Sequence, residues 1–270
     1  MLNKLDVLSL TWTKILLTIE QTLAIVGTDF RKLKHDPYEI FMRMVQPVVW
    51  LVIFGESLSR TKALNTGAVP YIDFIAPGIL AQSMLFISIF YGIALIWERD
   101  MGVLHKILVT PTPRAVLVIG RALAAGGRCL IQVFVIYLLS YILGIQLRLE
   151  FIPFLGVLLV VLMGGALFST LSLIIASLVK KRERFMGIGQ VLTMPLFFAS
   201  NALYPLEIMP QWVKVVSKLN PLTYIVDAIR TMMIQGEASL FGLGKDFLII
   251  GFAITVLIVI ATKLYPKILY

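Results

Sequence analysis

Long apolar runs alternate with short polar segments over most of the chain. The runs lie at about 40–58, 74–96, 115–143, 154–179, 185–203 and 247–261. An α-helix rises about 1.5 Å per residue, so about 20 apolar residues cross the hydrocarbon core of a bilayer. The pattern therefore predicts an all-α integral membrane protein with six transmembrane helices.

The segment 1–39 follows a different pattern. Apolar residues recur at roughly helical spacing between Thr11 and Phe30, Trp12 among them, and polar residues stand between them. This mixture is too polar for a span and predicts an amphipathic helix that lies at the membrane interface. No small-residue cleavage site follows it, so we do not expect a secretory signal. We divide the chain into this N-terminal segment and a six-span domain, 40–270.

Composition and charge agree with a membrane protein. The chain is 59% hydrophobic and 14% charged, whereas soluble domains are about 45–50% apolar and about 25% charged. These values exclude a soluble enzyme and a disordered chain. In the six-span topology, the side that holds the termini carries 17 basic and 8 acidic residues, and the opposite side carries seven of each. Because Lys and Arg favour the cytoplasmic side, we expect both termini in the cytoplasm.

The sequence offers little chemistry for catalysis. Its two histidines, His35 and His105, lie in polar segments, and its one cysteine, Cys129, lies in an apolar run. No cluster of Cys and His has the spacing of a zinc site. The string at 242–246 lacks the spacing and the hydroxyl group of a phosphate-binding loop. We expect no enzyme activity, no cofactor or metal bound by this chain, and no nucleic-acid partner.

Two polar segments have features beyond those of simple connectors. In the loop 97–114, Val103, Leu104, Ile107 and Leu108 form an apolar stripe on a short helix. This helix either rests on lipid or docks into a groove of a soluble partner. The segment 201–237 contains Pro205, Pro210 and Pro221. It is either an ordinary outer loop with interfacial helices or a broken helix that re-enters the membrane against protein or a wet cavity.

Four sequence blocks, in this order, resemble the permease subunit of type-2 ABC exporters, in the branch similar to daunorubicin-resistance permeases. The first is RKLKHDP at 31–37 with QPVVWLVIFG after it, and the second is WERDMGVLHKILVTPTPR at 97–114 followed by GRAL. The third is YPLEIMPQW at 204–212, and the fourth is NPLTY at 220–224, with Asp227 and Arg230 after it. The resemblance covers nearly the whole chain.

The resemblance implies roles for three of these segments. The stretch at about 99–110 would be a coupling helix, begun by Glu98 and seated in a cleft of a separate ATPase subunit. Its residues are Glu98, Arg99, Asp100, Gly102, Val103, Leu104, His105, Lys106, Ile107, Thr110 and Pro111. The N-terminal amphipathic helix would be an interface helix, with Trp12, Lys32, Lys34, Asp36 and Pro37. The segment at about 201–237 would form extracellular re-entrant helices, with Asn201, Tyr204, Pro205, Glu207, Pro210, Asn220 and Pro221.

The resemblance also implies an assembly. Two permease copies, expected to form a homodimer, would pair with two ATPase subunits that bind ATP and Mg²⁺. The substrate path would follow the first, second and fifth spans at the interface of the two permeases, through Gln46, Trp50, Gln82, Ser83, Phe86, Thr193 and Phe197. These spans lack a ring of charges, which favours export of an amphipathic, drug-like or lipid-like substrate over a small ion. The expected location is the cytoplasmic (inner) membrane of a prokaryote, in contact with membrane lipids.

Two alternatives remain. A permease of the same family could export a polysaccharide or a glycolipid. An ATP-independent secondary transporter needs carboxylates inside its spans to bind coupling ions. Here Glu56 and Asp73 stand at the ends of predicted spans, so this alternative is the weaker one.

Overall fold

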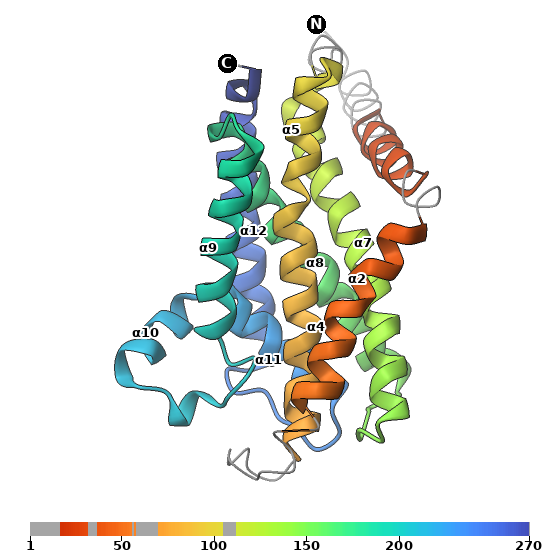
Figure 1. Cartoon of the computed structure of the whole chain (residues 1–270), viewed down its shortest axis with the longest axis vertical. Helices are drawn as coiled ribbons and strands as arrows, with labels where there is room; N and C mark the ends of the chain where they lie inside the picture. Colours follow the sequence, from red (N-terminus) through yellow and green to blue (C-terminus); the bar gives the residue numbers. More distant parts are fainter. Residues whose placement is uncertain (1–16, 32–36, 56, 58–69, 105–111, 270) are drawn as a thin grey trace, which may run out of the picture.

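The protein is a bundle of helices (Figure 1). The computed structural model describes residues 17–31, 37–55, 57, 70–104 and 112–269. After a helix over residues 17–31, the order is α2 (Pro37–Val49), the π-helix η1 (Trp50–Gly55), α4 (Tyr71–Phe90), α5 (Gly92–Asp100), α7 (Arg114–Ile142), α8 (Phe151–Leu178), α9 (Arg182–Phe198), η2 (Leu206–Ile208), α10 (Gln211–Leu219), α11 (Pro221–Met233), α12 (Leu243–Leu264) and η3 (Tyr265–Leu269). We call the top of the bundle in Figure 1, where α5 ends, the α5 end.

Four of the described helices are long and apolar enough to cross a membrane. They are Tyr71–Asp100, Arg114–Ile142, Phe151–Leu178 and Leu243–Ile268, and they correspond to the second, third, fourth and sixth predicted spans. The first predicted span corresponds to the shorter apolar helix Phe41–Gly55, and the fifth to α9, which has 17 residues. The all-α membrane fold is thus confirmed, while the number of six spans stays a prediction.

Small residues bring α7 and α8 into close contact. A Cβ atom on Gly165 would lie 2.7 Å from the Cα atom of Gly126. No larger residue fits at this crossing without moving one helix away from the other. The main core forms around this contact and includes α4, α8 and α11.

A proline interrupts α2, and a side chain from another helix compensates for it. Pro47 has no N–H group, so it cannot bond the carbonyl of Arg43 four residues earlier. The Nε2 atom of Gln132, in α7, donates to that carbonyl at 3.3 Å. The helix then widens into η1 from Trp50 onward. Because an unpaired carbonyl is costly at membrane depth, Gln132 makes this break compatible with a buried position.

The segment at 201–237 forms two helices with different surroundings. α10 projects from the side of the bundle (Figure 1), and Trp212 and Leu219 on it are exposed. α11 is buried and packs against α4, α8 and α12. Its Arg230 donates to the carbonyls of Phe74 and Asn201. The two helices therefore form a hairpin, one arm of which belongs to the core.

The helix over residues 17–31 packs on α7. A Cβ atom on Gly120 would lie 2.9 Å from Ile25, and one on Gly127 would lie 2.7 Å from Phe30. Its other face leaves Leu23 exposed, so its apolar residues are divided between α7 and the surroundings. Its position at the membrane interface stays a prediction. Of the residues assigned to the interface helix, Trp12, Lys32, Lys34 and Asp36 lie outside the described residues, and Pro37 begins α2.

Candidate functional site

The predicted coupling segment begins inside a long helix. Glu98, Arg99 and Asp100 form the last turn of α5, which follows α4 with a single turn residue between them. The chain then turns at Gly102, whose φ of +73° favours glycine. Glu98 therefore lies in the last turn of α5 rather than beginning a separate helix; helical structure resumes at Val103 and Leu104, and the coupling helix as a whole stays a prediction. His105, Lys106, Ile107, Thr110 and Pro111 lie outside the described residues.

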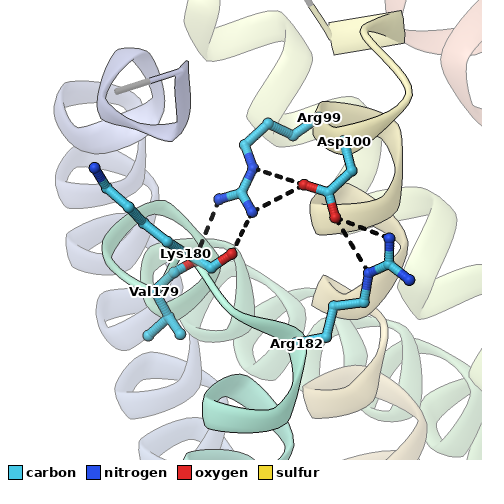
Figure 2. Close-up of polar contacts among 5 residues, drawn as sticks. All are labelled: Arg99, Asp100, Val179, Lys180 and Arg182. Atoms are coloured by element: carbon cyan, nitrogen blue, oxygen red, sulfur yellow. Dashed lines mark hydrogen bonds and ion pairs between the residues drawn. The ribbon is translucent and has the colours of Figure 1, made fainter.

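Asp100 joins α5 to the start of α9 through two arginines. Its Oδ1 atom accepts from Arg99 Nη2 at 3.0 Å, and its Oδ2 atom accepts from Arg182 Nη2 at 2.9 Å (Figure 2). Arg99 also donates to the carbonyls of Val179 and Lys180, which follow the end of α8. Those carbonyls have no helical partner at a helix end, so the arginine completes their bonding. We call Arg99, Asp100 and Arg182 the clamp.

An aromatic ring adds to the clamp. The guanidinium carbon of Arg182 lies 3.4 Å from the centroid of the Trp97 ring. A cation over an indole face is attracted by the negative charge of that face, by about 0.5–1 kcal/mol at exposed sites. The side chains of Arg182 and Asp100 are 32% and 36% exposed, so water and salt reach these contacts. The clamp thus has a defined geometry, but water and ions can compete with its contacts.

Two buried ion pairs connect α7 to other helices, one to α5 and one to the helix at 17–31. Glu98 Oε2 lies 2.5 Å from Arg121 Nη2, and both side chains are largely buried. Asp29, from the helix at 17–31, accepts from the hydroxyl group of Tyr91 and lies 3.5 Å from Arg128. Removing one partner of a buried pair leaves an uncompensated charge. Arg121 and Arg128 therefore both make ion pairs within the chain.

The predicted coupling residues divide into two groups in the structure. Glu98, Arg99 and Asp100 contact other parts of the chain, as described above. Leu104 is also fully buried, in a second core that includes Leu95 and Phe185. Val103 and Met101 are exposed. In the described part of the segment, these two are the apolar side chains available to a partner, and Leu104 anchors the segment to the bundle.

Part of the predicted substrate path comes together in one groove. Gln46, Ser83 and Phe86 line a cavity of about 150 Å³ between α2 and α4. Trp50 meets Phe197 edge-on, with the ring centroids 6.1 Å apart. Gln82 and Thr193 are buried, and the hydroxyl group of Thr193 bonds the carbonyl of Gly189 in its own helix.

The predicted re-entrant residues mostly hold the hairpin in place. The Nδ2 atom of Asn220 donates to the carbonyl of Leu196 at 2.6 Å, and its Oδ1 atom caps α11 at the amide of Leu222. The hydroxyl group of Tyr204 donates to the carbonyl of Phe198, and the carbonyl of Glu207 accepts from Lys214. Pro205 precedes η2, Pro210 precedes α10 and Pro221 begins α11. Asn201 is buried, and its side-chain amide has no hydrogen-bond partner among the described residues.

Sequence reasoning missed three features of this region. It did not predict that Arg182 would join Asp100, because residues 82 positions apart leave no local signal of their contact. It did not single out Arg184 and Lys218, which line grooves along α9. It also missed the bonds of Asp227, which accepts from the backbone amides of Leu240 and Phe241 before α12 begins.

Comparison with known proteins identifies the family. Residues 20–234 match the family model of the ABC-2 type transporter. The chain belongs to this family. Relatives of the ABC-2 permease include the transport permease ycf38 of Cyanophora paradoxa, 31% identical over 93% of this chain and 89% of the relative. The daunorubicin resistance ABC transporter permease protein DrrB1 of Streptomyces coeruleorubidus is 22% identical over 92% of this chain and 86% of its own length.

A third relative extends the set. The doxorubicin resistance ABC transporter permease protein DrrC of Mycobacterium tuberculosis is 25% identical over 82% of this chain and 79% of its own length. The recognition of a type-2 ABC permease, with relatives in the drug-exporter branch, is thus confirmed. The chain is a multi-pass membrane protein of an ABC transporter, and its family implies an ATPase partner.

Proposed function

We propose that this ABC-2 permease moves an amphipathic, drug-like or lipid-like substrate outward across the cytoplasmic membrane of a prokaryotic cell. Two copies form a twofold dimer and bind two ATPase subunits, which hold ATP and Mg²⁺. The α5 end lies in the cytoplasm and receives the ATPase through the segment that follows Asp100. The observation that carries the proposal is the clamp, because it joins that segment to α9, one of the helices expected along the path.

The clamp gives a route for the work of ATP. Moving a two-state equilibrium from 1:99 to 99:1 requires about 5.5 kcal/mol of differential binding. A permease without a nucleotide site cannot supply this cyclically, so the energy enters where the ATPase touches the chain. When the residues after Asp100 move, Asp100 pulls Arg182 at the first turn of α9. The Arg99 bonds to Val179 and Lys180 carry the same movement to the end of α8.

The groove between α2 and α4 supports a path between two permease copies. It is lined by Gln46, Ser83 and Phe86, a mixture of polar and aromatic groups suited to an amphipathic substrate. Phe41 and Val45, on the same helix as Gln46, are exposed. Apolar groups of this kind favour cover by a second copy, and a twofold dimer is the commonest closed assembly.

The test is a reconstitution of the permease with its ATPase in liposomes. We expect a stable complex whose ATP turnover rises with amphipathic compounds and whose transport needs Asp100. The variant Asp100→Asn should keep the complex and its ATP hydrolysis but lower transport about tenfold, because both arginines lose a charged partner. The control is Glu150→Gln, which breaks the exposed pair with Arg148 outside the clamp. Failure of any ATPase to bind, or full transport by Asp100→Asn, would contradict the proposal.

A further inference from the structure

Two large grooves adjoin along α9. The first, of about 490 Å³, is lined by Arg184, Gly187, Ile188, Val191 and Leu192. The second, of about 500 Å³, lies between α8, α9, the α10–α11 turn and α12, with Leu192, Leu196 and Lys218 among its lining residues. Leu192 lines both, so the two grooves are neighbours along α9. We call the two grooves together the α9 track.

The α9 track is apolar and has a cation in each groove. Arg184 is the one charged residue that lines the first groove, and Lys218 is the one that lines the second, among the residues that the structure describes. Neither side chain makes a hydrogen bond or ion pair with another described residue. Arg43 also lines the smaller groove between α2 and α4, together with neutral residues. Three grooves with basic and no acidic lining groups favour an anionic occupant.

Lys218 has an exposed side chain and stands near the end of α10, part-way along the length of the bundle. α11 runs antiparallel to α8: a Cβ atom on Gly164 would lie 3.1 Å from Ile225, and Gly156 contacts Met232. This register places Pro221, which begins α11, beside Phe168, and both residues line the second groove. At about 1.5 Å per residue, Phe168 lies about 26 Å from the start of α8, a helix of about 42 Å. Lys218 comes three residues before Pro221, near the end of α10, so this part of the chain lies level with the interior of α8 rather than with its first turn.

A lysine at this level of α8 needs a polar environment. Ionisable residues within a membrane are costly, face the interior or a wet cavity, and often mark a substrate path. The turn that holds Lys218 is also fixed against α9, because Asn220 bonds the carbonyl of Leu196. Arg184 and Leu196 are 12 residues apart, which is about 18 Å along the helix. The α9 track thus extends from the first turn of α9 to the hairpin, with an apolar wall between the two cations.

We propose that the exported substrate is an acidic amphiphile, whose anionic group binds Arg184 at the cytoplasmic end and then Lys218 near the end of α10. Its apolar part lies against Ile188, Val191 and Leu192. The proposal deepens the proposed function and rests on it for the direction of movement. It distinguishes substrates by charge: a cationic drug is repelled by both side chains, and a neutral one gains nothing from them. Occupation by a resident lipid is a different outcome, which the test below separates.

The test uses the ATPase–permease complex and three photoreactive probes with the same tail: dodecyl phosphate, dodecanol and dodecylamine. Labelling is measured without nucleotide, and the labelled peptides are mapped. We expect dodecyl phosphate to label α9 and α12 at a concentration about tenfold lower than dodecanol needs, because a charge-assisted hydrogen bond contributes about that factor. Dodecylamine should label more weakly than dodecanol.

Matched variants test which side chain gives the preference for dodecyl phosphate. Lys218→Gln should remove the advantage of dodecyl phosphate in the second groove, while Lys218→Arg should retain it. The control is Lys214→Gln, one turn earlier on α10, where the ammonium group bonds the carbonyl of Glu207 instead of lining the groove. Arg184→Gln should lower phosphate labelling in the first groove only. Equal labelling by phosphate and alcohol, or a full advantage in Lys218→Gln, would overturn the proposal.

ATP turnover separates a substrate from a lipid. A transported phosphate should leave the track, so its labelling should fall when ATP and Mg²⁺ are added. Unchanged labelling during turnover would identify a resident acidic lipid and overturn the assignment to substrate. Since the nucleotide-free assay can also be run on the permease by itself, absence of an ATPase partner would contradict only the proposed function. An intact complex that exports neutral or cationic amphiphiles without preference would contradict only this inference.

Discussion

The two ends of α9 are held by different chemistry. At its first turn, Arg182 makes charged contacts with Asp100 and Trp97 that water can reach. At its other end, the carbonyl of Leu196 accepts a neutral hydrogen bond from the buried Asn220, and the carbonyl of Phe198 accepts an exposed one from Tyr204. Exposed ion pairs are weak and exchange readily, whereas buried hydrogen bonds are costly to leave unmade. From this difference we propose that α9 turns about a fixed C-terminal end while its N-terminal end is driven.

The largest effect should come from loosening the fixed end. In Asn220→Ala, the carbonyl of Leu196 and the amide of Leu222 both lose their partner in a buried setting. We expect the free energy of unfolding to fall by about 2–3 kcal/mol, and the Tm of the purified protein to fall with it. Asn220→Asp keeps the cap on Leu222 and loses the donor to Leu196. Its free energy of unfolding should therefore lie between those of the wild type and Asn220→Ala. Unchanged stability in Asn220→Ala would contradict the claim that Asn220 fixes this end of α9.

A change at the driven end should have a small effect on stability and a large effect on transport. Asp100→Asn should lower the free energy of unfolding by less than about 1 kcal/mol, because its ion pairs are partly exposed. Transport should nevertheless fall about tenfold, as stated above. Thermal unfolding and transport are measured on the same preparation. A large loss of stability would show that the clamp is part of the folded core instead.

A smaller effect should follow from removing the ring at the clamp. Trp97→Leu removes the cation–π contact with Arg182 and keeps an apolar side chain. We expect a loss of about 0.5 kcal/mol or less in stability, and about a twofold reduction in transport. Trp97→Phe should retain part of the contact and lie closer to the wild type. Equal transport by the wild type, Trp97→Leu and Trp97→Phe would show that the ring contributes nothing to transport and that only the ion pairs of the clamp matter.

The smallest effect should come from salt. Raising ionic strength from about 0.1 M to about 1 M shortens the Debye length from about 10 Å to about 3 Å, so it weakens exposed charge contacts and leaves buried hydrogen bonds nearly unchanged. Transport should therefore decline modestly with salt in the wild type and much less in Asp100→Asn, which has already lost the charged contact. The measurement is transport per ATP hydrolysed over a salt series. The same salt dependence in both proteins would place the sensitive charges elsewhere.

The sequence predicts the long apolar helices well and the interrupted ones poorly. α7 begins at Arg114 and α8 ends at Leu178, each one residue from the boundary that hydrophobicity alone indicates. α9 is shorter than predicted because the chain leaves the helix after Phe198 and turns through Ser200. The local pattern of side chains shows where an apolar helix can form. Where that helix ends inside a bundle depends on which hydrogen-bonding and packing partners lie nearby.

The contacts of the candidate site depend on distances along the chain that no local pattern contains. Gln132 bonds the carbonyl freed by Pro47, and Arg182 bonds Asp100, although each pair lies more than 80 residues apart. The residues of the coupling segment could be located by resemblance, but their orientation could not. Leu104 is apolar at a helical position whether it anchors to the bundle or faces a partner, and only the fold buries it. From the sequence alone, Lys218 lies in a polar connecting segment. Its position along the bundle follows only from the packing of α11 beside α8.

The movement of α9 tests the central claim most directly. Cys129 is buried, so spin labels can be attached to introduced cysteines at exposed positions. One pair joins Met186, near the driven end of α9, to Leu123 of α7, and another joins Phe198, at the fixed end, to Phe134 of α7. Distances are measured in the ATPase complex with and without ATP, in dimers with one labelled copy. We predict that the Met186 distance shifts by several ångström and the Phe198 distance stays nearly constant, with both constant in Asp100→Asn. Equal shifts at the two ends, or a Met186 shift that persists in Asp100→Asn, would contradict a driven helix turning about a fixed end.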